Sequence, residues 1–174
     1  MKKILCFVFL FWAAMMILTA CTKTPDIPQE LSKIPLTAEE FTQKAEAAGF
    51  NVEDLPNSWE EGVGIINCLR AGKDGYEFYF FVFNSQENTS IFYNYYQSAL
   101  ESQSALAAQN DDDFKDDSAS GENYEWYALT LNEQDSYGMY SMYSRIDSTM
   151  IMVNEYASNR EALNLIIKDL GYLD

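Results

Sequence analysis

The sequence predicts an α+β domain, with an antiparallel sheet of about five strands and helices packed on one face of that sheet. Hydrophobic residues make up 48% of the 174-residue chain, which is enough to build a packed core. The strand-like segments follow one another through short turns, and strands joined in this way pair antiparallel. Helix-like segments interrupt this series, and the resulting order of elements is α-β-β-α-β-β-β-α.

The first helix is predicted to begin after Thr37, because Thr37 and Glu40 have the spacing of a capping box. A hairpin follows, with strands over 63–70 and 76–83 and a glycine-containing turn between them. In the second strand, both sides carry large aromatic or apolar side chains. We therefore expect 76–83 to lie inside the sheet, with both of its faces covered for much of its length.

The second half of the domain is predicted to begin with a helix over 85–106, which carries a wide aromatic stripe. Residues 107–122 include a run of aspartates and are expected to form a mobile acidic loop. A last helix is predicted to open with a second capping box, formed by Ser158 and Glu161. Between the loop and this helix we expect three strands, over 124–131, 136–145 and 150–156.

Charge and residue content exclude several classes of protein. The chain has 11 Lys and Arg residues against 27 Asp and Glu residues, no histidine, and a formal net charge of -16. Binding to a nucleic-acid backbone depends on clustered basic residues, so we expect no nucleic-acid partner. Without histidine, Ser-His-Asp catalysis, Cys-His catalysis and most zinc sites are excluded. The acidic run 111–117 lacks the EF-hand pattern, because Lys115 and Asp116 occupy its fifth and sixth positions, and we expect no metal and no cofactor.

The N-terminus has the pattern of a secretory signal peptide. Lys2 and Lys3 form a short positive region, and residues 4–18 form an almost unbroken apolar run. A membrane-spanning helix needs about 20 apolar residues, and this run is shorter. We therefore expect residues 1–20 to be a leader that directs the chain out of the cytoplasm.

The end of this leader, Leu18-Thr19-Ala20-Cys21, resembles the lipobox of bacterial lipoproteins. The resemblance implies cleavage after Ala20 and a diacylglyceryl group on the thiol of Cys21, so that membrane lipid becomes a partner of the mature chain. Residues 21–36 contain three of the four prolines and are expected to form a semi-rigid tether. The predicted location is the extracytoplasmic face of the cell membrane, where the protein is held by its acyl chains.

Residues 37–174 are predicted to form a single domain, and its loose sequence patterns resemble a known family. These patterns are 37–41 with 48–50 in the first helix and its exit, 76–83 before the second helix, and 144–153 before the last helix. They are similar to an uncharacterised family of small surface lipoproteins of Gram-positive bacteria. The similarity implies the same topology and compartment, and it implies no activity.

Aromatic side chains on the predicted strands are the candidate binding residues. If one face of the sheet is uncovered, its aromatic rings would form a stacking platform for sugar rings or peptide side chains. We assign ligand binding on this basis to Tyr79, Trp126 and Tyr140. Arg145 is added because a guanidinium at a strand end can clamp a ligand carboxylate. The alternatives are that the aromatic residues lie at the edge of the core and that Arg145 forms a structural ion pair.

The sequence therefore predicts a non-catalytic, lipid-anchored binding module that contacts an envelope protein or peptide through an aromatic sheet face. A second hypothesis is a lipoprotein that binds a small ligand such as a saccharide. A more distant one is a hydrolase that uses paired carboxylates. The lone cysteine of the folded domain, Cys68, is interpreted as a small buried hydrophobic residue, because no histidine is present to lower its pKa.

Overall fold

The computed structural model describes residues 32–55 and 63–174. The predicted leader 1–20, the lipidation site Cys21 with its lipobox, and residues 22–31 of the predicted tether lie outside the described residues. Within the described ranges, no helix is long and apolar enough to cross a membrane. The elements are α2 (Ala38–Ala47), β1 (Asn51–Asp54), β2 (Ile65–Lys73), β3 (Tyr76–Phe83), α3 (Gln86–Asn110), β4 (Phe114–Ser120), β5 (Tyr124–Leu131), β6 (Met139–Ile146), β7 (Thr149–Tyr156), the 3-10 turn η1 (Ala157–Asn159) and α4 (Arg160–Asp169).

The architecture is α+β, as predicted, with one antiparallel sheet. The sheet has seven strands in the order β1-β2-β3-β7-β6-β5-β4, so the prediction of about five strands, and with it the predicted element order, is wrong. The two additional strands, β1 and β4, lie at the two edges of the sheet. Their residues are mostly exposed. An edge strand pairs with one neighbour and needs little apolar surface, so neither segment carries the alternating pattern that reveals an inner strand.

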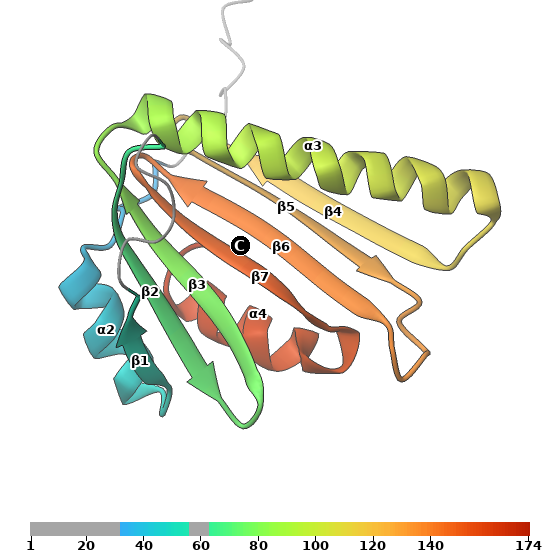
Figure 1. Cartoon of the computed structure of the whole chain (residues 1–174), viewed down its shortest axis with the longest axis horizontal. Coiled ribbons are helices and arrows are strands. Elements are labelled where there is room, and N and C mark those ends of the chain that lie inside the picture. The colour runs from blue at the N-terminus through green and yellow to red at the C-terminus, as the bar shows by residue number, and fades with distance from the viewer. Residues whose placement is uncertain (1–31, 56–62) are drawn as a thin grey trace, which may run out of the picture. The chain divides into compact units, whose positions relative to one another are not determined.

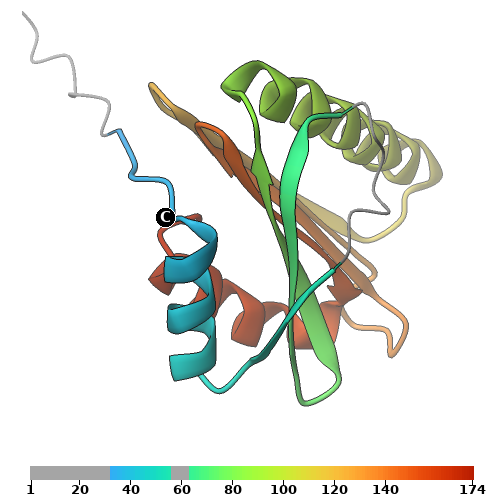
Figure 2. The same ribbon diagram turned by 60° about the vertical axis from the view of Figure 1, so that its left-hand side comes forward.

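The helices cover both faces of the sheet, and the prediction that they pack on one face is wrong. Figures 1 and 2 show α3 on one face, and α2 with α4 on the opposite face. The reason lies in the inner strands, which are apolar on both sides. In β3, Phe78 and Phe80 belong to the cluster under α2 and α4, whereas Phe81 and Phe83 belong to the cluster under α3. The expected covering of β3 on both faces is therefore confirmed.

The prediction that residues 107–122 form a mobile acidic loop is also wrong, because most of this segment is helix or strand. Its first residues complete α3, which ends at Asn110, and most of the remainder forms β4. Asp111 follows α3 in the left-handed conformation, with φ of 59°, and closes the helix. In β4, the carboxylate of Asp116 accepts hydrogen bonds from the hydroxyls of Ser104 and Tyr127. These bonds and the backbone pairing with β5 hold a polar strand against the sheet.

One of the two predicted capping boxes forms. Thr37 accepts a hydrogen bond from the backbone N–H of Glu40, and the Glu40 side chain accepts one from the N–H of Thr37. The box predicted at Ser158 and Glu161 does not form, because η1 precedes α4 and shifts the N-cap position to Asn159. The side chain of Asn159 makes no capping hydrogen bond.

The domain has its own hydrophobic core, and its C-terminal segment is part of it. Among the residues that the structure describes, all members of both clusters lie between Leu36 and Leu173. Tyr172 is fully buried beside Phe80, with 6.0 Å between the ring centroids. The Ser144 hydroxyl donates to the carbonyl of Tyr172, and the Tyr172 hydroxyl shares a hydrogen bond with Thr149. Burial and hydrogen bonding of Tyr172 therefore hold the C-terminal segment against the sheet.

Candidate functional site

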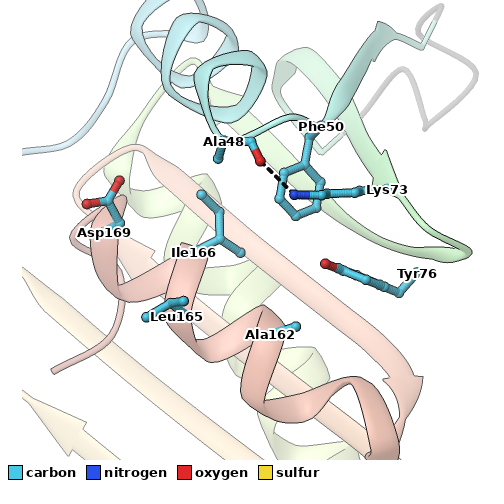
Figure 3. A pocket seen from close by; sticks show the side chains of 8 residues that line it. All are labelled: Ala48, Phe50, Lys73, Tyr76, Ala162, Leu165, Ile166 and Asp169. Carbon is cyan, nitrogen blue, oxygen red and sulfur yellow. Dashed lines mark hydrogen bonds between the residues drawn. The ribbon is translucent and has the colours of Figure 1, made fainter.

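A groove with a volume of about 390 Å³ opens on the α2 and α4 face of the domain (Figure 3). One wall is α4, and the other is formed by the end of α2, the segment that leaves it, and the β2–β3 hairpin. The lining residues are Ala48, Phe50, Lys73, Tyr76, Ala162, Leu165, Ile166 and Asp169. Pockets that hold small molecules have volumes of about 300–1,000 Å³ and a mostly apolar lining with a few polar groups.

The α4 wall follows from the spacing of its residues. Ala162, Leu165, Ile166 and Asp169 recur at three- and four-residue intervals, which places them along one side of the helix. Ile166 is buried and forms the base of this wall, whereas Leu165 is 74% exposed. The apolar surface of α4 is therefore wider than the stripe that packs on the sheet, and the excess faces the groove.

The opposite wall presents two polar groups beside an aromatic ring. Phe50 is buried and packs edge-on against Phe78 and Tyr76, with centroids 5.3 and 5.8 Å away. The Lys73 ammonium lies 5.4 Å from the centroid of the Phe50 ring. It donates a hydrogen bond of 2.8 Å to the carbonyl of Ala48, the C-cap of α2. In Figure 3, this amino group is directed at the Ala48 carbonyl, and the Tyr76 hydroxyl points from the hairpin toward α4.

Lys73 differs from the other partly buried cations of the domain in its partner. Every arginine of the chain and Lys33 form ion pairs with carboxylates: Arg70 with Glu53 and Glu77, Arg145 with Glu125, Arg160 with Glu133, and Lys33 with Asp174. Within the described ranges, no carboxylate lies within ion-pair distance of Lys73. Its charge meets the carbonyl end of α2, which carries a partial negative charge, and the ring of Phe50.

The four residues predicted to bind a ligand are divided between the two faces of the sheet. Trp126 and Tyr140 lie in the cluster under α2 and α4, where they are 7% and 1% exposed. The Trp126 indole donates to Asp174, and the Tyr140 hydroxyl donates to Asn164 at 2.5 Å. Neither ring is part of an exposed platform. Both act as packing residues with satisfied polar groups.

Tyr79 and Arg145 lie on the α3 face. The half-buried Tyr79 donates its hydroxyl to Glu77 at 2.5 Å, and burial together with this bond raises its pKa to about 12. Arg145 pairs with Glu125, which is the structural ion pair considered from the sequence, and its guanidinium lies 5.9 Å from the Tyr93 ring centroid. The structure brings none of the four predicted residues into the groove.

The described residues include no group of three or more histidine, cysteine, aspartate or glutamate side chains placed to hold a metal ion. Cys68 is buried, and burial, followed by the charge of Asp54, raises the pKa of its thiol to about 11. At neutral pH this thiol is protonated, and a protonated thiol is a weak nucleophile. Its surroundings match the interpretation of Cys68 as a buried hydrophobic residue.

The sequence contained one indication of the groove, an apolar residue of the last helix that lies outside the stripe facing the core. In α4, Leu163, Ile166, Ile167 and Leu170 account for the face on the sheet, and Leu165 lies outside this stripe. An exposed leucine is common by itself. Here it lines the groove together with Phe50, which lies on the segment between α2 and β1, and only the tertiary packing places these two residues in one groove.

The fold and the groove define an α+β domain that carries a mostly apolar groove walled on one side by α4. No family model, curated protein or solved structure matches this chain. The chemistry of the groove itself is therefore the basis for a functional proposal.

Proposed function

We propose that this chain is a lipid-anchored protein of the extracytoplasmic face of the cell membrane, and that its domain binds an apolar ligand without catalysis in the groove between α2 and α4. The observation that carries the proposal is the groove itself, a volume of about 390 Å³ whose lining includes buried Phe50, Ile166 and the exposed Leu165. Its size and apolar lining support ligand binding. The lipobox resemblance of residues 18–21 supports the anchor, with membrane lipid as a partner.

The groove supports an apolar ligand better than a saccharide. Saccharide sites combine exposed aromatic faces with many hydrogen-bonding groups, and here the polar groups are Lys73, Tyr76 and Asp169 alone. It also supports a binding surface on this side of the domain better than one on the sheet, because the rings of Trp126 and Tyr140 are buried. An envelope peptide with apolar side chains remains a suitable partner.

The anchor predicts that a Cys21→Ser variant, expressed as the full chain, incorporates no labelled palmitate, because the thiol is the acceptor of the lipid. Mass spectrometry of the wild-type protein is expected to show a mature N-terminus at Cys21 that carries acyl groups. The matched control is Cys68→Ala, which replaces the buried cysteine of the domain and should keep the label. An unmodified Cys21 behind an intact leader would contradict the anchor.

Ligand binding predicts that Leu165→Lys weakens the binding of indole, a neutral apolar probe, by about tenfold, because burial of a leucine side chain contributes about 1.5–3 kcal/mol. Ligand-observed NMR with the domain 24–174, which carries its own core, measures this. The control is Leu106→Lys, since Leu106 is also exposed, at 57%, but lies on α3. Indole that binds both variants as tightly as wild type, or that binds none of the proteins, would overturn the proposed site.

A further inference from the structure

We propose that the occupant of the groove is a short apolar peptide with free ends, whose carboxylate binds Lys73 and whose ammonium binds Asp169. This inference rests on the proposed function, because it names the ligand class of the same groove. It follows from three features of the lining: an ammonium that has no carboxylate partner among the described residues, a carboxylate that has no cation partner among them, and an apolar surface in the same groove.

The Lys73 end of the groove has free hydrogen-bonding capacity. An ammonium group has three donors, and Ala48 accepts one of them. The Tyr76 hydroxyl points toward α4 and has no hydrogen-bond partner among the residues that the structure describes. Lys73 is partly buried, so its remaining charge is screened less than that of an exposed surface lysine. A carboxylate placed here would receive a charge-assisted hydrogen bond from the ammonium, with the hydroxyl nearby as a second donor.

The Asp169 end of the groove favours a positively charged group on the ligand. Asp169 lies in the last turn of α4, where the helix dipole disfavours a carboxylate. In the part of the chain that the structure describes, no lysine or arginine forms an ion pair with it. A ligand ammonium would therefore neutralise the side chain and the carbonyl end of the helix together. Figure 3 shows Asp169 at one end of the α4 wall, beyond Ile166.

A ligand with both charges also suits the domain as a whole. The chain has a net charge of -16, which repels a simple anion such as a fatty-acid carboxylate. A zwitterion carries no net charge and avoids this repulsion. The apolar residues of the lining, Phe50, Leu165 and Ile166, favour apolar side chains on the ligand.

The length of the groove sets the length of the peptide. The α4 wall runs from Ala162 to Asp169, which is about 10 Å along a helix axis. An extended peptide advances about 3.3 Å per residue, so about three residues span this wall. A tripeptide is therefore long enough to extend along the whole α4 wall.

The inference is tested by titrating leucyl-alanyl-leucine into the domain 24–174 in a calorimeter, with three forms of the peptide: free, C-terminally amidated, and N-terminally acetylated. On wild-type protein, each blocked form is expected to bind about tenfold more weakly than the free peptide, because blocking an end removes its charge and its charge-assisted hydrogen bond. Lys73→Gln should remove the penalty of amidation, and Asp169→Asn should remove the penalty of acetylation. This pattern would assign each peptide end to one side chain.

The glutamine at position 73 keeps a donor for the Ala48 carbonyl, and thermal unfolding shows whether each variant folds. The matched control is Lys44→Gln, because Lys44 is an exposed lysine of α2 outside the groove. If a variant fails to fold, the comparison of peptides on wild type still decides the inference.

Two outcomes would overturn the inference and leave the proposed function intact. The first is equal binding of the free, the amidated and the acetylated peptide, while indole still distinguishes Leu165→Lys from wild type. The second is tighter binding of decanoate than of the free peptide, which would identify an amphipathic anion as the ligand. The proposed function itself fails only if indole does not bind at the groove.

Discussion

Phe80→Ala is expected to lower the free energy of unfolding by about 3–5 kcal/mol, which is the usual cost of removing a buried phenylalanine ring. Phe80 lies on the inner strand β3 and is fully buried. Its ring stacks on Phe41 of α2, with centroids 4.4 Å apart and planes at 6°. It also meets the edge of Tyr172. The cavity would thus open where α2, the sheet and the C-terminal segment join.

Domains have about 5–15 kcal/mol of stability, so this single change should remove a large part of it. Urea unfolding followed by circular dichroism measures the loss, and Tyr95→Ala is the matched control. Tyr95 is 72% exposed on α3, and its removal should cost less than about 0.5 kcal/mol. Because Phe41 holds α2 to the sheet, Phe80→Ala should also weaken indole binding in the groove. A loss below about 1 kcal/mol would show that the packing between α2 and β3 contributes little.

Raising the pH from about 9 to about 12 is expected to unfold the domain. Burial, with a smaller contribution from Asp54, raises the pKa of Cys68 from 9.0 to about 11. Burial also raises the pKa of Tyr140 and of Tyr172 from 10.0 to about 12. In each case the folded state holds the proton more tightly than the unfolded chain. Stability is therefore complete below about pH 9 and is lost as the pH rises through the folded-state pKa values.

Urea unfolding at a series of pH values measures this loss, and absorbance at 295 nm reports tyrosinate. The buried tyrosines should ionise together with unfolding and not before it. Cys68→Ala should flatten the first part of the decline, between about pH 9 and pH 11. Tyr140→Phe should flatten the later part, between about pH 10 and pH 12. A free energy of unfolding that stays constant up to pH 11 would contradict the prediction.

Local signals predicted the parts of the fold that depend on local contacts. Thr37 and Glu40 form the expected capping box because its hydrogen bonds join residues three apart. Residues 76–83 place their two aromatic sets on opposite faces, as strand geometry requires. The stripe of α4 that includes Leu163 and Ile167 packs on the sheet as its spacing indicates.

Local sequence patterns gave wrong predictions where a neighbouring element imposed a different structure on the same residues. The run at 158–161 matches a capping box, but the 3-10 turn that follows β7 takes up its first residues. The aspartates of 111–117 suggested a loop, although β5 offers a free backbone edge that pairs with 114–120. Backbone hydrogen bonds in a sheet are nearly independent of side-chain type. A polar segment can therefore form an edge strand although it lacks the alternating apolar pattern by which strands are predicted.

The amino-acid sequence by itself determined the α+β class, the helix start at Thr37 and the two-sided apolar character of β3, because these depend on residues close together in the chain. The tertiary structure alone decided that the helices divide between two faces, and that Lys73 and Leu165 line one groove. Those positions are far apart in the chain, and they meet because α4 packs on the same sheet face as α2 beside the β2–β3 hairpin. The groove thus arises from the packing of separate elements, and the local sequence pattern of each element does not predict which other elements it contacts.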